Sequence, residues 1–185
     1  IPAGQLAADI QIRGLAAGST TITPNAIGVN GTASSFTAYA PVLILSTTAI
    51  RLGQGQFEPN QYVYVTTYTN VAVPVTLTSS DTNVVTVTPS VTIPGGSNYA
   101  YFTTTARGLG MATVVMSSPG WTPDTMVVTT TTPYLGLSGG GTLFITSPAQ
   151  NVTVYAEDST RNVHYRTSSL VVRLASRDTM VMRVL

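Results

Sequence analysis

Few residues in this chain have side chains suited to catalysis. His164 is the only histidine, and the sequence places neither a nucleophilic serine nor a second carboxylate beside it. A catalytic triad needs a nucleophile, a base and an orienting group in one place. We therefore predict no enzyme activity and interpret His164 as an exposed strand residue.

The acidic residues have one adjacent pair, Glu157 and Asp158. Calcium sites between extracellular sandwich domains use clustered carboxylates, and two are too few unless folding brings Asp124 or Asp178 near. We interpret the pair as a solvated turn and predict no metal or cofactor site.

Two kinds of residue are compatible with sugars. Asn30 and Asn151 each begin an N-glycosylation acceptor pattern, and threonine runs at 103–105 and 129–132 are compatible with O-linked sugars. We interpret these segments as outward strand faces. Five tyrosines resemble a platform for sugar rings: Tyr62, Tyr64, Tyr68, Tyr99 and Tyr101. Neighbouring strands also pack aromatic side chains in pairs, and we prefer this second interpretation.

The composition excludes several classes of protein. The chain is 43% hydrophobic and 8% charged, with a net charge of +1, so it is not disordered. It lacks the basic stripe of a nucleic-acid binder, and we interpret the five arginines between 161 and 183 as a solvated face. Without cysteine there is no disulfide or thiolate zinc site, and without lysine no lysine isopeptide crosslink. No apolar run approaches the ~20 residues of a membrane span.

The periodicity predicts strands. Val73, Val75 and Leu77 alternate with polar residues, as in a half-buried strand, and Pro74 predicts an edge or a bulge there. Gly and Pro turns separate seven such runs, which favours an immunoglobulin-like β-sandwich. The runs are 42–46, 62–65, 71–77, 84–88, 99–105, 112–117 and 126–132.

The chain repeats itself at offsets of 92 to 97 residues, which indicates tandem domains. Residues 1–4 return as 93–96, 13–15 as 107–109, 41–46 as 133–138 and 75–82 as 172–179.

One part of the repeat carries a family resemblance. The string Val-Thr-Pro-Ser-Val-Thr-Ile-Pro-Gly-Gly at 87–96, the alternation at 99–105 and the glycine turn at 108–114 resemble the bacterial Ig-like repeats of the invasin and intimin superfamily. The resemblance implies a rod or spacer that carries an adhesive tip.

The repeat predicts one complete domain at 42–133, the back half of a domain at 1–41 and the front half at 134–185. Leu185 aligns with Thr88 and Ile1 with Ile93, so both ends fall at the same loop of the repeat. A half-sandwich leaves strand edges and a core face in water. Two interpretations remain open: a window on a longer array, or assembly in which 134–185 of one molecule pairs with 1–41 of the next.

We therefore predict an extracellular or cell-surface structural module, a rod, fibre or filament segment of a bacterial surface protein. Its partners are copies of itself, head to tail, or neighbouring domains. The alternative is an adhesin segment that binds carbohydrate or a host protein. We expect Trp121 to make an interdomain contact. The turn glycines and linker prolines should govern folding or assembly: Gly95, Gly96, Gly108, Gly110, Pro41 and Pro133.

Overall fold

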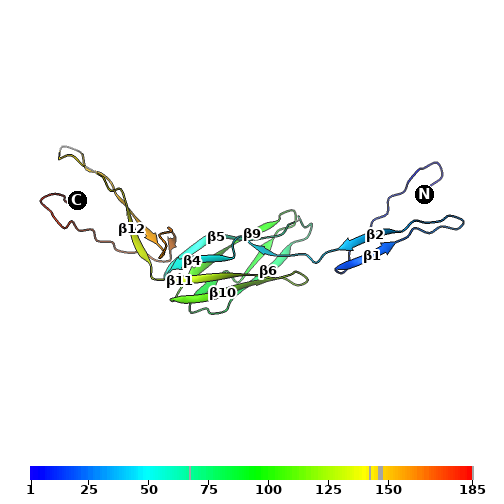
Figure 1. Cartoon of the computed structure of the whole chain (residues 1–185), viewed down its shortest axis with the longest axis horizontal. Helices are drawn as coiled ribbons and strands as arrows, with labels where there is room; N and C mark the ends of the chain where they lie inside the picture. Colours follow the sequence, from blue (N-terminus) through cyan, green and yellow to red (C-terminus); the bar gives the residue numbers. More distant parts are fainter. Residues whose placement is uncertain (67, 142, 146–147, 185) are drawn as a thin grey trace.

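The computed structural model describes residues 1–66, 68–141, 143–145 and 148–184. Leu185, which the repeat aligns with Thr88, lies outside them. The regular elements of the described residues are fourteen strands and no helix, which confirms the all-β prediction. Figure 1 shows a central sandwich with a hairpin projecting from each end. None of these residues belongs to a helix that is long and apolar enough to span a bilayer.

The central sandwich consists of two sheets. Its strands are β3 (Ile44–Leu45), β4 (Ala49–Gly53), β5 (Gln56–Tyr64), β6 (Val73–Ser79), β7 (Val85–Val87), β8 (Ser90–Ile93), β9 (Tyr99–Ala106), β10 (Gly110–Ser117), β11 (Asp124–Thr131) and β14 (Tyr165–Arg166). One sheet has the order β4-β11-β10-β6-β8 and the other β14-β5-β9-β7, with β3 also paired to β5. The β-sandwich prediction is confirmed for this part of the chain.

The core lies between these sheets and follows the alternation of the sequence. In β6 the inward Val73, Val75 and Leu77 are buried, while Pro74 and Thr76 are exposed. The same alternation runs along β9, β10 and β11. Because each strand contributes every second side chain to one face, the two sheets enclose a single apolar layer.

Pro74 does not make β6 an edge strand, because β8 lies outside it. At this point, however, β6 pairs on one side only: Pro74 faces Thr92 of β8, and pairing with β10 begins at Thr76. A proline is tolerated where one side of the strand has no ladder.

Three features of the strands differ from the prediction. β4 and β8 were not predicted, and β5 begins at Gln56 rather than at Tyr62. β5 contains a bulge between Glu58 and Gln61, at Pro59 and Asn60. A bulge accommodates such residues without ending the strand.

The projecting hairpins contain the remaining strands, β1 (Gly18–Ile22) with β2 (Ser34–Ala38), and β12 (Tyr134–Ser138) with β13 (Thr153–Glu157). Every residue of β1 is exposed, as are four of the five in β2. These hairpins therefore lack the second layer that buries the central strands.

Candidate functional site

The first hairpin has the same strand register as β10 and β11. Gly18 faces Ala38 in β1–β2, and Gly110 faces Thr130 in β10–β11, so both strands are displaced by the same 92 residues. The φ angles of the two glycines agree as well, +148° for Gly18 and +138° for Gly110. The local backbone of the central domain thus recurs in the hairpin.

Two turns show the same correspondence. Gly4 and Gly96 have φ of 79° and 82°, and Gly28 and Gly120 have φ of 75° and 78°, values at which glycine is the favoured residue. The turn hydrogen bonds also match: the N–H of Gln5 donates to the Pro2 carbonyl (3.1 Å), Ser97 to Pro94 (3.0 Å), Val29 to Ala26 (3.1 Å) and Trp121 to Ser118 (3.1 Å).

The segment after the sandwich shares two local contacts with the front of the central sandwich. Gly136 faces Tyr155 in β12–β13, as Ile44 faces Tyr64 in β3–β5. Farther along, the N–H of Met180 donates to Asp178 Oδ1 at 2.9 Å, as the N–H of Asn83 donates to Asp81 Oδ1 at 2.9 Å. The second agreement follows the offset of 97 found at 75–82, whereas the strand pair is displaced by 92 residues in β12 and by 91 in β13.

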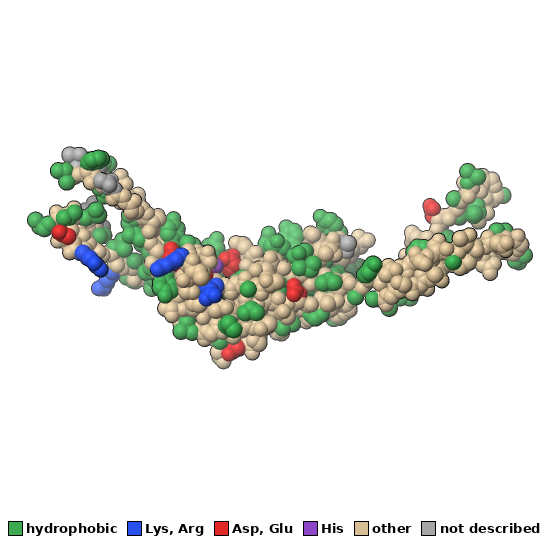
Figure 2. Space-filling view, viewed as in Figure 1, with side chains coloured by type: hydrophobic (Ala, Val, Ile, Leu, Met, Phe, Trp, Pro, Cys, Tyr) green, Lys and Arg blue, Asp and Glu red, His purple; other side chains and the backbone are tan. Residues whose placement is uncertain are grey.

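The corresponding positions differ greatly in burial. Leu43 and Val128 are fully buried in the central core, whereas Leu135 and Phe36, at the corresponding places in the hairpins, are 47% and 41% exposed. Figure 2 shows hydrophobic side chains on the surface of both projections. In the first hairpin, a hollow of about 450 Å³ is lined by Ile12, Leu15, Ile22 and Phe36 among others. Both hairpins thus present uncovered apolar faces.

The chain that follows the second hairpin forms backbone hydrogen bonds with the central sandwich. Tyr165 and Arg166 of β14 pair with Phe57 and Gln56 of β5. The N–H and Oγ1 of Thr167 both donate to the Gly55 carbonyl at 3.0 Å. The segment between β13 and the region that corresponds to β6 is longer than its counterpart in the central domain, and this extra length forms the attachment.

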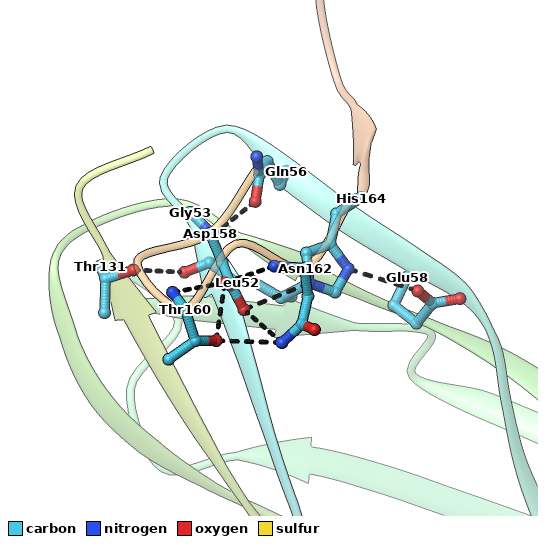
Figure 3. Close-up of polar contacts among 9 residues, drawn as sticks. All are labelled: Leu52, Gly53, Gln56, Glu58, Thr131, Asp158, Thr160, Asn162 and His164. Atoms are coloured by element: carbon cyan, nitrogen blue, oxygen red, sulfur yellow. Dashed lines mark hydrogen bonds and ion pairs between the residues drawn. The ribbon is translucent and has the colours of Figure 1, made fainter. Parts of the chain in front are cut away.

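Asp158 lies in the loop at 158–164 that leads from the second hairpin to β14, which we call the attachment loop (Figure 3). Asp158 is buried, so the prediction of a solvated turn was wrong for this residue. Its carboxylate accepts hydrogen bonds from Thr160 N (2.7 Å), Thr160 Oγ1 (2.8 Å), Asn162 N (3.1 Å) and Asn162 Nδ2 (3.4 Å). Burial acts to raise the pKa of this carboxyl, but the hydrogen bonds from Thr160 and Asn162 outweigh it and hold the pKa below the usual value. The charged form is therefore part of the folded loop.

Arg161 is held in the same loop with a φ of 72°, the one positive value among non-glycine residues of the described chain. Such a conformation costs about 1–3 kcal/mol. Its guanidinium lies 3.2 Å from Glu157 Oε2 and 4.7 Å from the centre of the Tyr134 ring. These contacts tie the loop to the hairpin.

His164 lies between two carboxylates and is not the exposed residue that we predicted. Nδ1 is 3.5 Å from Glu58 Oε2 on β5, and Nε2 is 3.5 Å from Asp158 Oδ2 in the loop (Figure 3). The imidazole is 13% exposed. His164 thus joins the hairpin loop to the sandwich, because the fold brings together residues 106 positions apart in the sequence.

Asp124 and Asp178, the other carboxylates considered for a calcium site, make hydrogen bonds elsewhere in the fold. Asp124 accepts a hydrogen bond from the N–H of Leu45 at 3.0 Å, and Asp178 caps its own turn, so neither joins Glu157 and Asp158. Within the described residues no cluster of three or more His, Cys, Asp or Glu is arranged to hold a metal ion.

The linker prolines and turn glycines lie close to the backbone of neighbouring strands and loops. Thr122 N–H donates to the Pro41 carbonyl at 2.9 Å. A Cβ added to Gly53 would lie 2.8 Å from Pro133 Cα, so the second linker packs closely on β4. A Cβ on Gly95 would lie 2.8 Å from the Asn70 carbonyl oxygen, and one on Gly108 would lie 2.7 Å from that of Asn83.

The threonine runs are not wholly outward, which corrects that expectation. Thr104 and Thr130 are buried in the central domain. Asn30 and Asn151 are exposed. Trp121 is half-buried against the core and lines a hollow of about 450 Å³ with residues 69–74.

Four of the five tyrosines form one patch on the outer face of β5 and β9. Tyr62 faces Tyr101 and Tyr64 faces Tyr99 across the two strands. Neighbouring ring centroids are 5.4–6.2 Å apart, while Tyr68 lies apart in an exposed loop. The rings pack on one another and still expose part of their surface.

Comparison with known proteins gives no family. No family model matches the chain, and no curated protein matches it. The invasin and intimin assignment therefore remains a resemblance in sequence pattern.

Several solved structures are similar to the chain. Domains 5–6 of the S-layer protein SbsC share 18% identity over 66% of each chain, with a TM-score of 0.43. Domains 1–6 of SbsC match 81% of this chain at 18% identity, with a TM-score of 0.45. The chain spans 21% of that structure and 27% of the one holding domains 4–9. At these scores and identities we base no functional argument on the likeness.

Proposed function

We propose that this chain is a structural module of a bacterial cell-surface rod or fibre, built of Ig-like sandwiches set end to end. In this proposal residues 42–133 are one complete sandwich, 1–41 are the back half of the preceding one, and 134–185 are the front half of the next. Neighbouring half-domains complete each other and extend the rod head to tail. The function is mechanical and associative.

The observation that carries the proposal is which strands form in the flanks. In the central domain, β10–β11 is the strand pair contained within the back half, and β3–β5 is the pair contained within the front half. Of the other ladders between strands of 42–133, four join the two halves: β4–β11, β5–β9, β6–β10 and β7–β9. The fifth, β6–β8, uses residues 90–92, which fall between the halves. The flanks contain the counterparts of the two internal pairs, β1–β2 and β12–β13.

The missing strands support the same interpretation. Residues 170–174 correspond to β6 and keep its apolar alternation, yet they form no strand. Their counterparts pair with β10, in the other half of the domain, and with β8, most of which falls between the two halves. A strand needs a partner for its backbone hydrogen bonds, so a half-domain forms only the pairs that it contains.

The attachment loop gives the rod its stiffness at one junction. Asp158 and His164 connect the second hairpin to β5 of the sandwich, and β14 adds backbone pairing. Because these contacts lie in the extra length of the second flank, they serve the junction between successive domains.

The test is to supply the missing half in the same chain. A copy of residues 89–92 followed by a copy of 1–41 is added after Leu185, so that the second flank can fold as a full sandwich. We expect amides of 170–174 to become protected from hydrogen exchange, as those of β6 are. A matched control adds a shuffled copy of the same residues. If the two extended chains exchange equally fast at 170–174, the half-domain interpretation is wrong.

The tyrosine patch favours a second candidate, an adhesin segment that binds a neutral saccharide. Tyr62, Tyr99 and Tyr101 keep part of their rings exposed on the outer face of β5 and β9, where a sugar ring could stack. A glycan-array screen of the chain against Tyr62→Ala/Tyr101→Ala tests this. Binding that the double variant loses supports the candidate, and equal binding by both chains contradicts it.

A further inference from the structure

We propose that the neighbour which completes each flank is a second copy of this chain. The inference rests on the proposed function and names its partner. The first flank carries the positions of β10 and β11, and the second carries those of β3 to β7. Together the two flanks hold the positions of every strand of 42–133 except most of β8, because residues 90–92 have no counterpart in either flank.

The central domain fixes the register of the contact. There, Val114 of β10 faces Ser79 of β6 and Val115 faces Thr78. Shifting these pairs by the offsets of the two flanks makes Ile22 of one copy face Ser176 of the other, and Thr23 face Ala175. The parallel pair Val127–Ala49 becomes Ser35–Gly141 in the same way.

The surfaces suit a desolvated contact. Residues 14–41 contain no charged side chain, so covering them carries no penalty for burying an ion. The second flank offers Leu135, Leu137, Val172 and Leu174, all exposed and all at positions whose counterparts are buried in the central core. Joining half-domains would bury on the order of 2,000 Å² or more, the size of obligate interfaces.

A single chain cannot make this contact with itself. The two hairpins project from opposite ends of the sandwich (Figure 1), so the first flank reaches the second flank of another molecule. A heterologous contact of this kind does not close on itself and therefore favours an open polymer. In strand addition, a strand of one protein extends a sheet of another. Here the added element would be half a domain.

The test uses the absence of cysteine in the natural sequence. Thr23→Cys and Ala175→Cys are introduced together, and the full chain is oxidised mildly. A disulfide needs Cα atoms roughly 4.4–6.8 Å apart, so it reports the register. We expect the monomer band to be lost to a ladder of dimers, trimers and longer species on non-reducing gels. Each single variant should give no ladder, while a mixture of the two should give a dimer.

The matched control pairs Thr23→Cys with Ser159→Cys, an exposed loop position outside the inferred contact. Trp121, the one tryptophan, shows by its fluorescence that the sandwich stays folded. If both double variants give the same products and light scattering finds a monomer at all concentrations, the second copy is not the partner. The proposed function would still stand if the extended chain gains protection at 170–174, and would fall with the inference if it does not.

Discussion

The central sandwich and its two flanks carry the same pattern of residues but differ in what that pattern buries. Val128 is fully buried and Phe36, its counterpart, is 41% exposed. Gly110 and Gly18 nevertheless have nearly the same φ. Local backbone geometry is thus specified by the nearby sequence, whereas burial in the central sandwich requires the second sheet.

The comparison also shows what a β-strand needs. Residues 73–77 lie in β6 because β8 and β10 lie beside them. Residues 170–174 have apolar side chains at the positions of Val73, Val75 and Leu77 and no such neighbours within the described chain. Alternation predicts a strand only where a partner supplies the ladder.

The largest expected difference concerns matched leucines in the centre and the flank. Leu43→Ala should lower the free energy of unfolding of the central sandwich by about 2–5 kcal/mol, because it leaves a cavity in a close-packed core. Leu135→Ala, at the corresponding exposed position, should leave it unchanged in dilute protein. Urea unfolding followed by Trp121 fluorescence measures both. Equal losses would show that the flank already buries its leucine.

A second difference concerns two aspartates that cap turns. Asp158→Ala should destabilise the attachment loop by about 1–3 kcal/mol, because it removes the buried carboxylate that accepts the hydrogen bonds of Thr160 and Asn162. Asp178→Ala removes an exposed cap and should change the junction little. NMR signals of the Tyr165 and Arg166 amides report whether β14 stays paired. Loss of pairing in the Asp178 variant alone would contradict this assignment.

The same carboxyl predicts a pH dependence of the junction. The folded loop holds the pKa of Asp158 below its usual value, so the charged form contributes stability above the unfolded pKa of about 3.9, and this is lost as the pH falls through the folded pKa. The Thr160 and Asn162 amide shifts should move in that range. Asp158→Asn should remove the response, and an unchanged response in that variant would assign it to another group.

The smallest expected difference concerns the paired glycines. Gly110→Ala should cost the central domain about 1–3 kcal/mol, because alanine strains at a φ of 138° and its Cβ would lie 3.4 Å from Val84 Cγ2. Gly18→Ala imposes the strain outside the sandwich and should leave its melting temperature unchanged. Thermal melts read by Trp121 fluorescence test the pair. A lowered temperature for Gly18→Ala would show coupling between hairpin and sandwich.

Several features followed from the sequence alone. Alternation at 73–77 and the frequent Gly and Pro turns indicated a sandwich, and the repeat offsets marked the backbone correspondences now seen at Gly18 and Gly110. These features depend on neighbouring residues, whose conformational preferences are local. The sequence therefore specified the strand period, the turns and the frame of the repeat.

The tertiary structure decided the rest. β4 and β8 form because β11 and β6 lie beside them. Asp158 is buried and His164 half-buried because the loop returns to Glu58 on β5. From the sequence alone we interpreted Asp158 as part of a solvated turn and His164 as an exposed strand residue. Burial and strand pairing depend on contacts between segments far apart in the chain, and such contacts exist only once the fold has formed.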